Sequence, residues 1–494
     1  MNRLKVKEKF RPQFHFSPES NWMNDPNGMV YYDGEYHLFY QYHPFGTTWG
    51  PMHWGHALSK DLIHWDHLPI ALAPDENGAI FSGSAVVDWN DTTGFFDGKS
   101  GLVAIFTHAD NYLGSDRPRQ RQSLAYSTDN GRTWTKYAGN PVLVDESITD
   151  FRDPKVFWHQ ESKKWVMILA AGNHVRFYTS QDLKIWSFAS EFGKEEGSHA
   201  GVWECPDLFK LQVNGNPNHN KWVMIVSIGN ESAYEEGSRT QYFIGDFDGL
   251  TFTNDYSNET ILWLDHGRDN YAGVTWSDIP NEDARRIFIG WMSNWKYANE
   301  TPTDSWRSAM TVPRELSLAE TSDGIRLIQT PLAELKKLRQ EKQSLENLNL
   351  EADKNLAVEF LSDQLEIIAE FELQSTTEFG FKVRKSDIEE TIIGYSASEN
   401  FLFVNRVNSG ISNFNEFFPC KHGASLSPKN NRIKLHIFVD CSSVEVFANE
   451  GELVMTDQIF PDPSSKGLEL YTKDGKVKLL SLTIYQLDSI YRSR

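Results

Sequence analysis

Three short motifs each combine an acidic residue with a proline: "NDP" at 24–26, "RDP" at 152–154 and "ECP" at 204–206. Carboxylates gathered in one pocket can act as acids, bases and nucleophiles. The template that such a group matches best is glycoside hydrolysis, in which a protonated carboxylic acid works with an ionised partner. Taken alone, Asp25 is better explained as a turn residue, because "NDPNG" consists of turn formers. The chemistry therefore depends on whether Asp25, Asp153 and Glu204 converge.

The segments around these motifs predict the elements that would bring them together. Strand–turn–strand patterns with alternating apolar positions recur five times before residue 330, at 27–43, 81–108, 153–172, 205–229 and 271–292. A repeat of about 50 to 70 residues with roughly four strands is typical of a β-propeller blade. Five hairpins predict five blades, and the innermost strands of a propeller surround one central channel. Residues at their starts would then face one pocket.

The alignment of the three motifs has one irregularity. When the motifs are superimposed on their prolines, Glu204 falls one position before the two aspartates, and Cys205 takes the aspartate position. A shift of one residue normally turns a side chain to the other face of a strand. We expect the convergence to hold nevertheless, because strand ends are irregular and Glu is longer than Asp. For Cys205, a small buried residue beside the acid is favoured over a nucleophilic thiol.

After the propeller pattern, the sequence predicts two further parts. Residues 331–353 place apolar positions at helical spacing amid dense charge, which indicates a helical linker. Residues 354–494 contain short alternating strands separated by turns, as in a β-sandwich. The predicted fold is therefore all-β, with a propeller at 1–330, the linker and a C-terminal sandwich.

Composition narrows the classes of partner. The net charge of −20 disfavours nucleic acid and anionic membranes. No run of 18 apolar residues is present, and three cysteines give no disulfide framework. The first twenty residues lack the apolar stretch of a signal peptide, so the sequence as written is expected to be cytoplasmic, or secreted if a leader has been removed.

Longer motifs connect the sequence to a known family. "WMNDPNG", "FSGS", "FRDP" and "WECPDLF" occur in this order, followed by "RDNYAGVTW", "GWMSNW", "WRSAMTVPREL" and "VDCSSVEVF". The chain resembles the glycoside hydrolase family 32 β-fructosidases over nearly its whole length, and within them most closely the levanases and exo-inulinases. The resemblance implies a five-bladed propeller with a C-terminal β-sandwich, and retention of configuration at the anomeric carbon of fructose.

The resemblance also implies roles for individual residues. Asp25 matches the nucleophile, Glu204 the general acid/base, and Asp153 the residue that stabilises the transition state through fructose hydroxyls. The positions that match the family's fructose-binding residues are Asn24, Gln41, Trp49, Phe81, Ser82, Arg152, Tyr271 and Trp291. Amides and hydroxyls can bond sugar hydroxyls, and an aromatic face can cover a sugar ring. Taken alone, Trp49 and Trp291 would more often be core residues.

The main hypothesis is hydrolysis of terminal fructose from fructans, namely levan and also inulin, and from sucrose. An intracellular invertase acting on sucrose or short fructo-oligosaccharides is the first alternative, because a polymer cannot enter a cell. A fructosyltransferase and a carbohydrate-binding propeller without turnover are more remote alternatives. The sequence leaves linkage preference and oligomeric state open, although the sandwich could mediate self-association.

No cofactor and no metal are expected. The pairs His53, His56 and His64, His67 have a spacing that could supply two metal ligands, but a third and a fourth are not evident. No phosphate-binding loop or nucleophile elbow is present.

Overall fold

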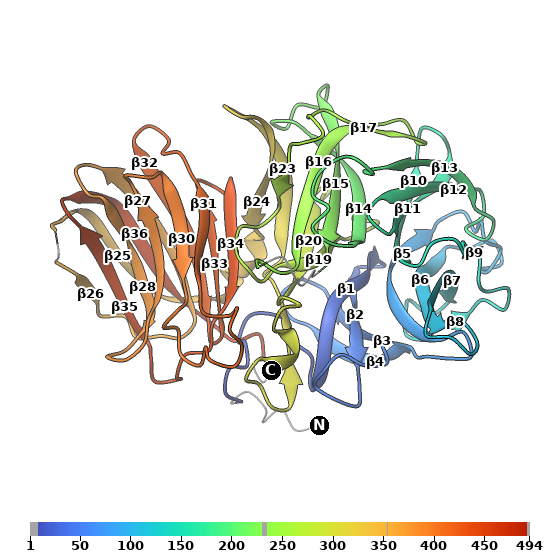
Figure 1. The fold of residues 1–494 in the computed structure, drawn as a ribbon, viewed down its shortest axis with the longest axis horizontal. Coiled ribbons are helices and arrows are strands. Elements are labelled where there is room, and N and C mark those ends of the chain that lie inside the picture. Colours follow the sequence, from blue (N-terminus) through green and yellow to red (C-terminus); the bar gives the residue numbers. More distant parts are fainter. Residues whose placement is uncertain (1–7, 230–234, 353, 492–494) are drawn as a thin grey trace.

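The computed structural model describes residues 8–229, 235–352 and 354–491. The outer ends of the predicted domain ranges, 1–7 and 492–494, and the last residue of the predicted linker therefore lie outside the described residues. The chain forms two β domains that lie side by side, a propeller and a sandwich (Figure 1). This confirms the all-β prediction.

Five sheets form the blades of the propeller, and the first strand of each sheet in chain order lies innermost. The first blade contains β1 (Asn21–Tyr32), β2 (Glu35–His43), β3 (His53–Ser59), β4 (Asp66–Leu72) and the later β21 (Trp306–Arg307). The second contains β5 (Ala79–Asp88), β6 (Gly101–Asn111), β7 (Pro118–Ser127), β8 (Thr135–Lys136) and β9 (Leu143–Val144). The third contains β10 (Phe151–His159), β11 (Lys164–Ala171), β12 (Val175–Ser180) and β13 (Ser187–Phe192).

The fourth blade contains β14 (Trp203–Gln212), β15 (Asn220–Ile228), β16 (Arg239–Phe247), β17 (Phe252–Asn254) and β18 (Leu262–Trp263). The fifth contains β19 (Tyr271–Thr275), β20 (Arg286–Met292), β22 (Ala309–Met310), β23 (Arg314–Thr321) and β24 (Gly324–Pro331). A short 3-10 helix, η1 (Ala298–Glu300), precedes β21. The ring closes where β21 pairs in parallel with the start of β1.

The five hairpins predicted from alternation are all present as antiparallel pairs of the first and second strands of each blade. Each inner strand is interrupted near its start by a β-bulge, where two residues lie opposite a single residue of the neighbouring strand. A bulge bends the strand and re-aims side chains. Five such bulges therefore redirect residues from five distant segments around the channel.

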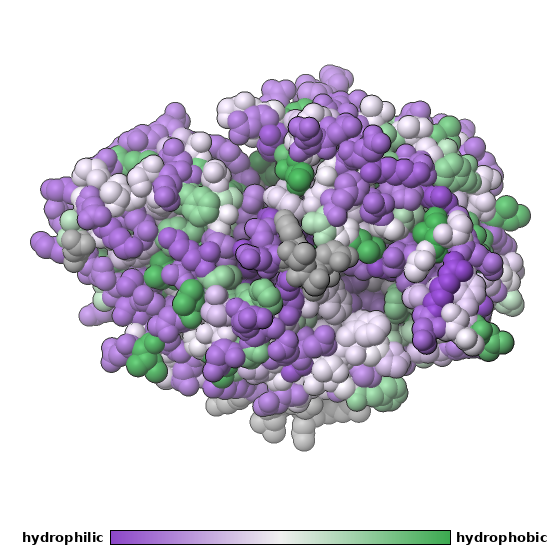
Figure 2. Space-filling view, in the orientation of Figure 1, coloured by the Kyte–Doolittle hydropathy of each residue, from purple (hydrophilic) through white to green (hydrophobic). Residues whose placement is uncertain are grey.

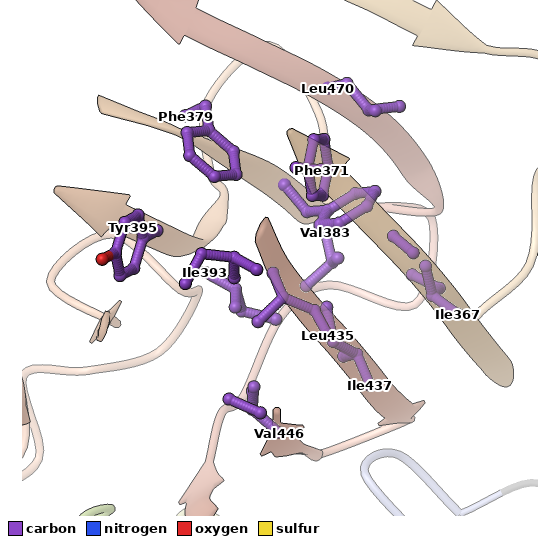
Figure 3. Close-up of a cluster of buried hydrophobic side chains, with 14 of the residues drawn as sticks. Ile367, Phe371, Phe379, Val383, Ile393, Tyr395, Leu435, Ile437, Val446 and Leu470 are labelled. Atoms are coloured by element: carbon purple, nitrogen blue, oxygen red, sulfur yellow. The ribbon is translucent and has the colours of Figure 1, made fainter. Parts of the chain in front are cut away.

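The C-terminal domain packs two six-stranded sheets face to face (Figure 1). One contains β25 (Arg339–Leu350), β36 (Val477–Leu487), β27 (Leu365–Leu373), β32 (Arg432–Asp440), β33 (Ser443–Ala448) and β34 (Leu453–Gln458). The other contains β26 (Leu356–Val358), β35 (Gly467–Lys473), β28 (Glu378–Lys385), β29 (Thr391–Ser396), β30 (Phe401–Asn405) and β31 (Lys421–Ser425). Alternating side chains of both sheets fill the space between them, and Figure 3 shows Phe371, Phe379 and Ile437 among this core.

The prediction of a helical linker at 331–353 is wrong about the secondary structure. Only η2 (Ala333–Leu338) is helical, as a 3-10 helix, and β25 follows it directly as an edge strand of the sandwich. The misleading signal was the three-residue spacing of Leu345 and Leu348. Both pack against the sandwich core, and the left-handed backbone of Asn347 between them (φ 54°) changes the phase of alternation. The dense charge of this segment suits an edge strand, which must avoid pairing with other chains.

The visible face of the molecule is mostly hydrophilic, with small separate hydrophobic areas (Figure 2). Within the described ranges, no helix has both the length and the apolar composition needed to cross a membrane.

Candidate active site

Asp25 lies in the bulge of β1 and is held by neutral donors. The Ser82 hydroxyl, from the neighbouring inner strand β5, donates to Asp25 Oδ2 at 2.7 Å, and Asn24 Nδ2 donates to Oδ1 at 2.9 Å. Asn24 is itself fixed, because its Oδ1 accepts a hydrogen bond of 2.7 Å from the Trp22 indole. These bonds leave Asp25 a single orientation at the start of the channel.

Asp153 lies in the bulge of β10, where its backbone is left-handed (φ 65°). Its Oδ2 accepts a hydrogen bond of 3.0 Å from the backbone N–H of Cys205, in the bulge of β14. The Cys205 thiol lies 3.6 Å from Asp153 Oδ2 and 3.4 Å from Asp25 Oδ2. One sulfur atom thus contacts both aspartates, which places two carboxylates from segments far apart in sequence in one pocket.

Glu204 immediately precedes this cysteine and completes the group of acids. Arg152 Nη2 donates to Glu204 Oε1 at 2.7 Å, and the Tyr271 hydroxyl donates to Oε2. The Glu204 side chain is 21% exposed, whereas the Asp153 side chain is 6% exposed. Of these two acids, Glu204 is therefore the more accessible to solvent.

The bulges explain how three acids with different sequence offsets share one pocket. Counted from the last paired residue before each bulge, Glu204 is the paired residue itself, Asp153 is the first bulge residue and Asp25 is the second. The alignment on the prolines is therefore one residue wrong for "NDP", because Pro26 is already paired with Tyr40 while Pro154 and Pro206 lie inside their bulges. The usual alternation of faces does not apply where the strand is bulged.

The electrostatics of this pocket are dominated by burial and by a shortage of cations. Burial raises the pKa of Asp25, the charge of Glu204 raises it further, and the hydrogen bonds from Ser82 and Asn24 oppose both effects. Burial raises the pKa of Asp153 to about 7, although Arg152 opposes this. A single cation, Arg152, forms ion pairs with three carboxylates, those of Glu204, Asp153 and Asp150. Burial raises the pKa of the Cys205 thiol well above its ordinary value, so the thiol stays protonated and acts as a donor.

The structure places most of the predicted sugar-binding residues around these acids. Asn24, Ser82, Arg152 and Tyr271 contact them directly through the bonds described above. Phe81 lies in the bulge of β5, and its ring meets Trp49 edge-to-face at 6.2 Å. Trp49 is 48% exposed, and its backbone N–H is fixed by Asn299 Oδ1 at 2.9 Å. Trp49 is thus a rim residue, against the expectation for a tryptophan taken alone.

Gln41 and Trp291 lie one layer further back. Gln41 on β2 is buried, and its side-chain amide donates a hydrogen bond of 2.7 Å to Asn27 Oδ1. Trp291 is fully buried and packs against Trp22 and Tyr271. Its indole nitrogen has no hydrogen-bond partner among the described residues. Direct contact of these two residues with a sugar stays a prediction.

Sequence reasoning missed the residues that hold the "RDP" bulge in shape. Thr107 Oγ1 accepts a hydrogen bond of 3.1 Å from the backbone N–H of Asp153 and donates to Gln122, whose amide donates to Phe151 O at 2.7 Å. Asp150 accepts from Arg152 Nη1 at 2.5 Å. A polar Thr107 following the apolar run 102–106 was the available signal for the first of these.

The histidines considered as metal ligands have separate partners. His53 contacts Pro51 O, His56 contacts His37, and His64 contacts Asp61. Over the parts of the chain that the structure describes, no group of three or more His, Cys, Asp or Glu residues is arranged to hold a metal ion.

Comparison with known proteins agrees with this geometry. Residues 15–331 match the N-terminal domain of glycosyl hydrolases family 32, and residues 334–486 match its C-terminal domain. The chain is 57% identical over 490 residues to a levanase of Bacillus subtilis (strain 168), covering 98% of this chain and 71% of that protein. It is 43% identical to a levanase of Bacillus sp. (strain L7), of which it spans 53%.

Solved structures show the same similarity. The crystal structure of an exo-inulinase from Aspergillus awamori superposes with a TM-score of 0.90 at 38% identity, covering 99% of this chain and 100% of that one. A fructofuranosidase from Schwanniomyces occidentalis, solved in complex with fructose, gives 0.89 at 32% identity, covering 98% and 100%. With both family domains matched along its length and an acidic pocket at the centre of a five-bladed propeller, the chain belongs to glycosyl hydrolases family 32.

Proposed function

We propose that the protein is a retaining β-fructosidase that releases terminal fructose from fructans, with levan as its principal substrate. The observation that carries the proposal is the placement of Asp25, Asp153 and Glu204 around Cys205. Its levanase and exo-inulinase relatives support fructan as the substrate class.

In the first step, Glu204 donates a proton to the glycosidic oxygen while Asp25 attacks the anomeric carbon of the terminal fructosyl unit. The bond to the leaving sugar breaks, and a covalent fructosyl–enzyme ester forms on Asp25. Retaining enzymes place two such carboxyl groups about 5 to 5.5 Å apart, so that one reaches carbon and the other reaches oxygen. Glu204 suits proton transfer because its side chain remains 21% exposed and both of its oxygens are oriented, one by Arg152 and the other by Tyr271.

In the second step, Glu204 takes a proton from water, which attacks the ester and releases fructose with its original configuration. Asp25 suits the nucleophilic role because donors from Ser82 and Asn24 favour its ionised form despite burial. We assign Asp153 to hydrogen bonds with fructose hydroxyls that strengthen in the oxocarbenium-like transition state. Phe81 and Trp49 would line the sugar ring at the rim.

The time course of products from levan, inulin and sucrose, at matched enzyme concentration, tests the substrate. Fructose as the sole early product from levan, formed faster than from sucrose, is the expected result. Rapid cleavage of sucrose with levan left intact would instead support the alternative hypothesis of an invertase. Short levan oligomers as first products would contradict attack at the chain end.

We infer in addition that the enzyme acts outside the cell, since levan is a polymer that cannot enter it. A relative from Aspergillus awamori, 38% identical, is named an extracellular exo-inulinase, which supports this. Levan hydrolysis that appears only after the washed cells are lysed, and is absent both from the medium and from intact cells, would contradict the inference.

A further inference from the structure

A second cavity lies at the opposite mouth of the propeller from the acids. It has a volume of about 420 Å³ and is lined by the later residues of the same inner strands, including Val87 on β5, Trp158 on β10 and Phe209 on β14. Trp158 stands five residues beyond Asp153 on one strand, which corresponds to about 16 Å along the strand. This cavity is therefore separate from the catalytic pocket.

One wall of this cavity is an exposed tryptophan held in a fixed orientation. Trp89 directly follows β5 and is 57% exposed. Its indole N–H nevertheless donates to Asp278 Oδ1 at 2.9 Å, while Asp278 Oδ2 accepts from the backbone N–H of Val87 at 2.9 Å. Asp278 adopts a left-handed backbone (φ 58°), which is costly for a residue other than glycine. A strained residue thus fixes an aromatic face that solvent can reach.

Further aromatic rings in the lining have their polar edges tied in the same way. Trp158 Nε1 donates to Gln160 at 3.1 Å, and Trp165 Nε1 donates to Thr92 at 2.9 Å. The two indoles meet edge-to-face at 5.2 Å. Asn90, Gln160 and Thr92 add amide and hydroxyl groups to the lining. Fixed aromatic faces beside neutral polar groups suit a ligand with apolar faces and many hydroxyls.

The three cations that line the cavity, Lys155, Lys210 and Arg286, each have acidic partners, which disfavours an ionic ligand. Lys210 Nζ lies 3.2 Å from Glu161 Oε1. Lys155 Nζ lies 3.4 Å from Asp207 Oδ2, at the floor. The negative charges of Asp207 and Asp278 both act on the Arg286 guanidinium. The hydrogen bonds that its guanidinium donates are long, 3.3 Å to Trp276 O and 3.5 Å to Thr275 Oγ1. The guanidinium can therefore donate to a neutral hydroxyl without a net charge to satisfy.

We propose that the cavity at the far mouth of the propeller is a second, non-catalytic binding site for fructan chains, with Trp89 as its stacking platform. The choice of fructan as the neutral polyhydroxylated ligand rests on the proposed function. A polymer held there is kept near an enzyme that cuts only one end at a time. Binding at this site lowers the KM for polymer and leaves cleavage of sucrose unchanged.

The test separates this site from the catalytic one by two measurements. The first titrates a β-2,6-linked fructotetraose into the inactive double variant Asp25→Asn, Glu204→Gln by calorimetry. Two binding events are expected, of which Trp89→Ala weakens one by roughly fivefold or more. The second compares KM for levan with KM for sucrose in the active protein, where Trp89→Ala raises only the former, by severalfold.

Phe188→Ala is the matched control, because Phe188 is 56% exposed and lies on β13, away from the cavity. A single binding event in the parent, or a Trp89→Ala protein that matches Phe188→Ala in both measurements, overturns the proposal. The titration does not depend on turnover. Failure of the wild-type protein to hydrolyse any fructan, together with Trp89-dependent binding, would therefore refute the proposed function and leave the second site standing.

Discussion

Asp25 and Asp153, at the start of the inner strands, and Glu445, between propeller and sandwich, differ in whether cations offset the effect of burial on their pKa values. In the interface, Glu445 of β33 accepts from Arg314 Nη2 at 2.5 Å and lies 2.8 Å from His15 Nε2. Burial would raise the pKa of Glu445, yet Arg314 and His15 lower it below its ordinary value. In the pocket, burial raises the pKa values of Asp25 and Asp153. Arg152 opposes this effect at Asp153, and it is shared with Glu204 and Asp150.

The difference separates structural from chemical use of buried charge. A matched ion pair stabilises one arrangement of two domains and has little tendency to exchange protons. A group of under-compensated carboxylates costs stability, and it holds the groups near the protonation states that acid/base chemistry needs. Changes in the pocket should therefore affect turnover, and changes in the interface should affect unfolding.

The largest effect is expected from Asp25→Asn, which removes the proposed nucleophile. Turnover should fall by about 10⁴-fold or more, the scale seen when one member of a covalent catalytic unit is removed. Thermal unfolding should be unchanged or shifted upward, because an under-compensated charge is removed from the pocket. Activity is measured on levan with protein free of wild-type enzyme. A variant with near-normal turnover, or one that unfolds much earlier, would undo the comparison.

Glu204→Gln should lower turnover on sucrose by about 10² to 10⁴-fold, the usual worth of general acid catalysis. An aryl fructoside with a good leaving group needs little protonation, so its first step should be largely retained and should appear as a burst of phenol. Equal losses on the two substrates would argue that Glu204 is not the proton donor.

In the interface, Arg314→Met should leave Glu445 and Asp265 without their shared cation and lower the free energy of unfolding by about 3 kcal/mol or more. The matched control is Arg132→Met, which breaks the exposed pair with Glu35 and should cost about 1 kcal/mol or less. Chemical denaturation measures both. Similar losses in the two variants would show that burial of the Arg314 pair adds nothing.

His15 gives the interface a pH dependence with a definite sign. Although burial alone would lower its pKa, Asp440 and Glu445 raise the pKa of His15 to about 9. A raised pKa means that the stabilisation is complete below about pH 6.5 and is lost as the pH rises toward 9, by about 3 kcal/mol at most. His15→Asn should be less stable near neutrality and flatter over this range than the wild type. Parallel pH profiles, with the exposed-site variant His64→Asn as reference, would contradict the assignment.

The smallest effect concerns the acid limb of catalysis. Ser82→Ala removes a hydrogen bond that favours ionised Asp25, so the pKa of Asp25 should rise further. The acid limb of kcat/KM should then move to higher pH, with a smaller loss of activity above it. An unmoved acid limb would show that Ser82 does not tune the nucleophile.

Much of this fold could be predicted because each blade is a local unit. Alternation within residues 153–172 is sufficient to predict the hairpin β10–β11, and five such hairpins indicate the propeller. The prediction of a helical linker failed for the opposite reason. β25 is stabilised by pairing with β36, more than 120 residues away in the chain, while the spacing of its leucines is typical of a helix.

The site was predicted as a set of residues but not as an arrangement. Proline-based alignment placed Asp25 and Asp153 at equivalent positions, and the bulges move them one residue apart. A bulge depends on the pairing of the neighbouring strand, which no single motif encodes. The interface network was not predicted, because His15 and Asp440 are separated by 425 residues and the motif "VDCSSVEVF", which contains Asp440, does not indicate its partner.

Trapping the covalent intermediate tests the assignment of the pocket most directly. Glu204→Gln is treated with an aryl β-fructofuranoside, so that the first step proceeds while the second lacks its base, and the protein is then digested and analysed by mass spectrometry. We predict one added fructosyl unit on the peptide that contains Asp25, and none in the variant that also carries Asp25→Asn. A fructosyl unit on the peptide that contains Asp153, or a burst of phenol with no adduct anywhere, would contradict the assignment of Asp25 as the nucleophile.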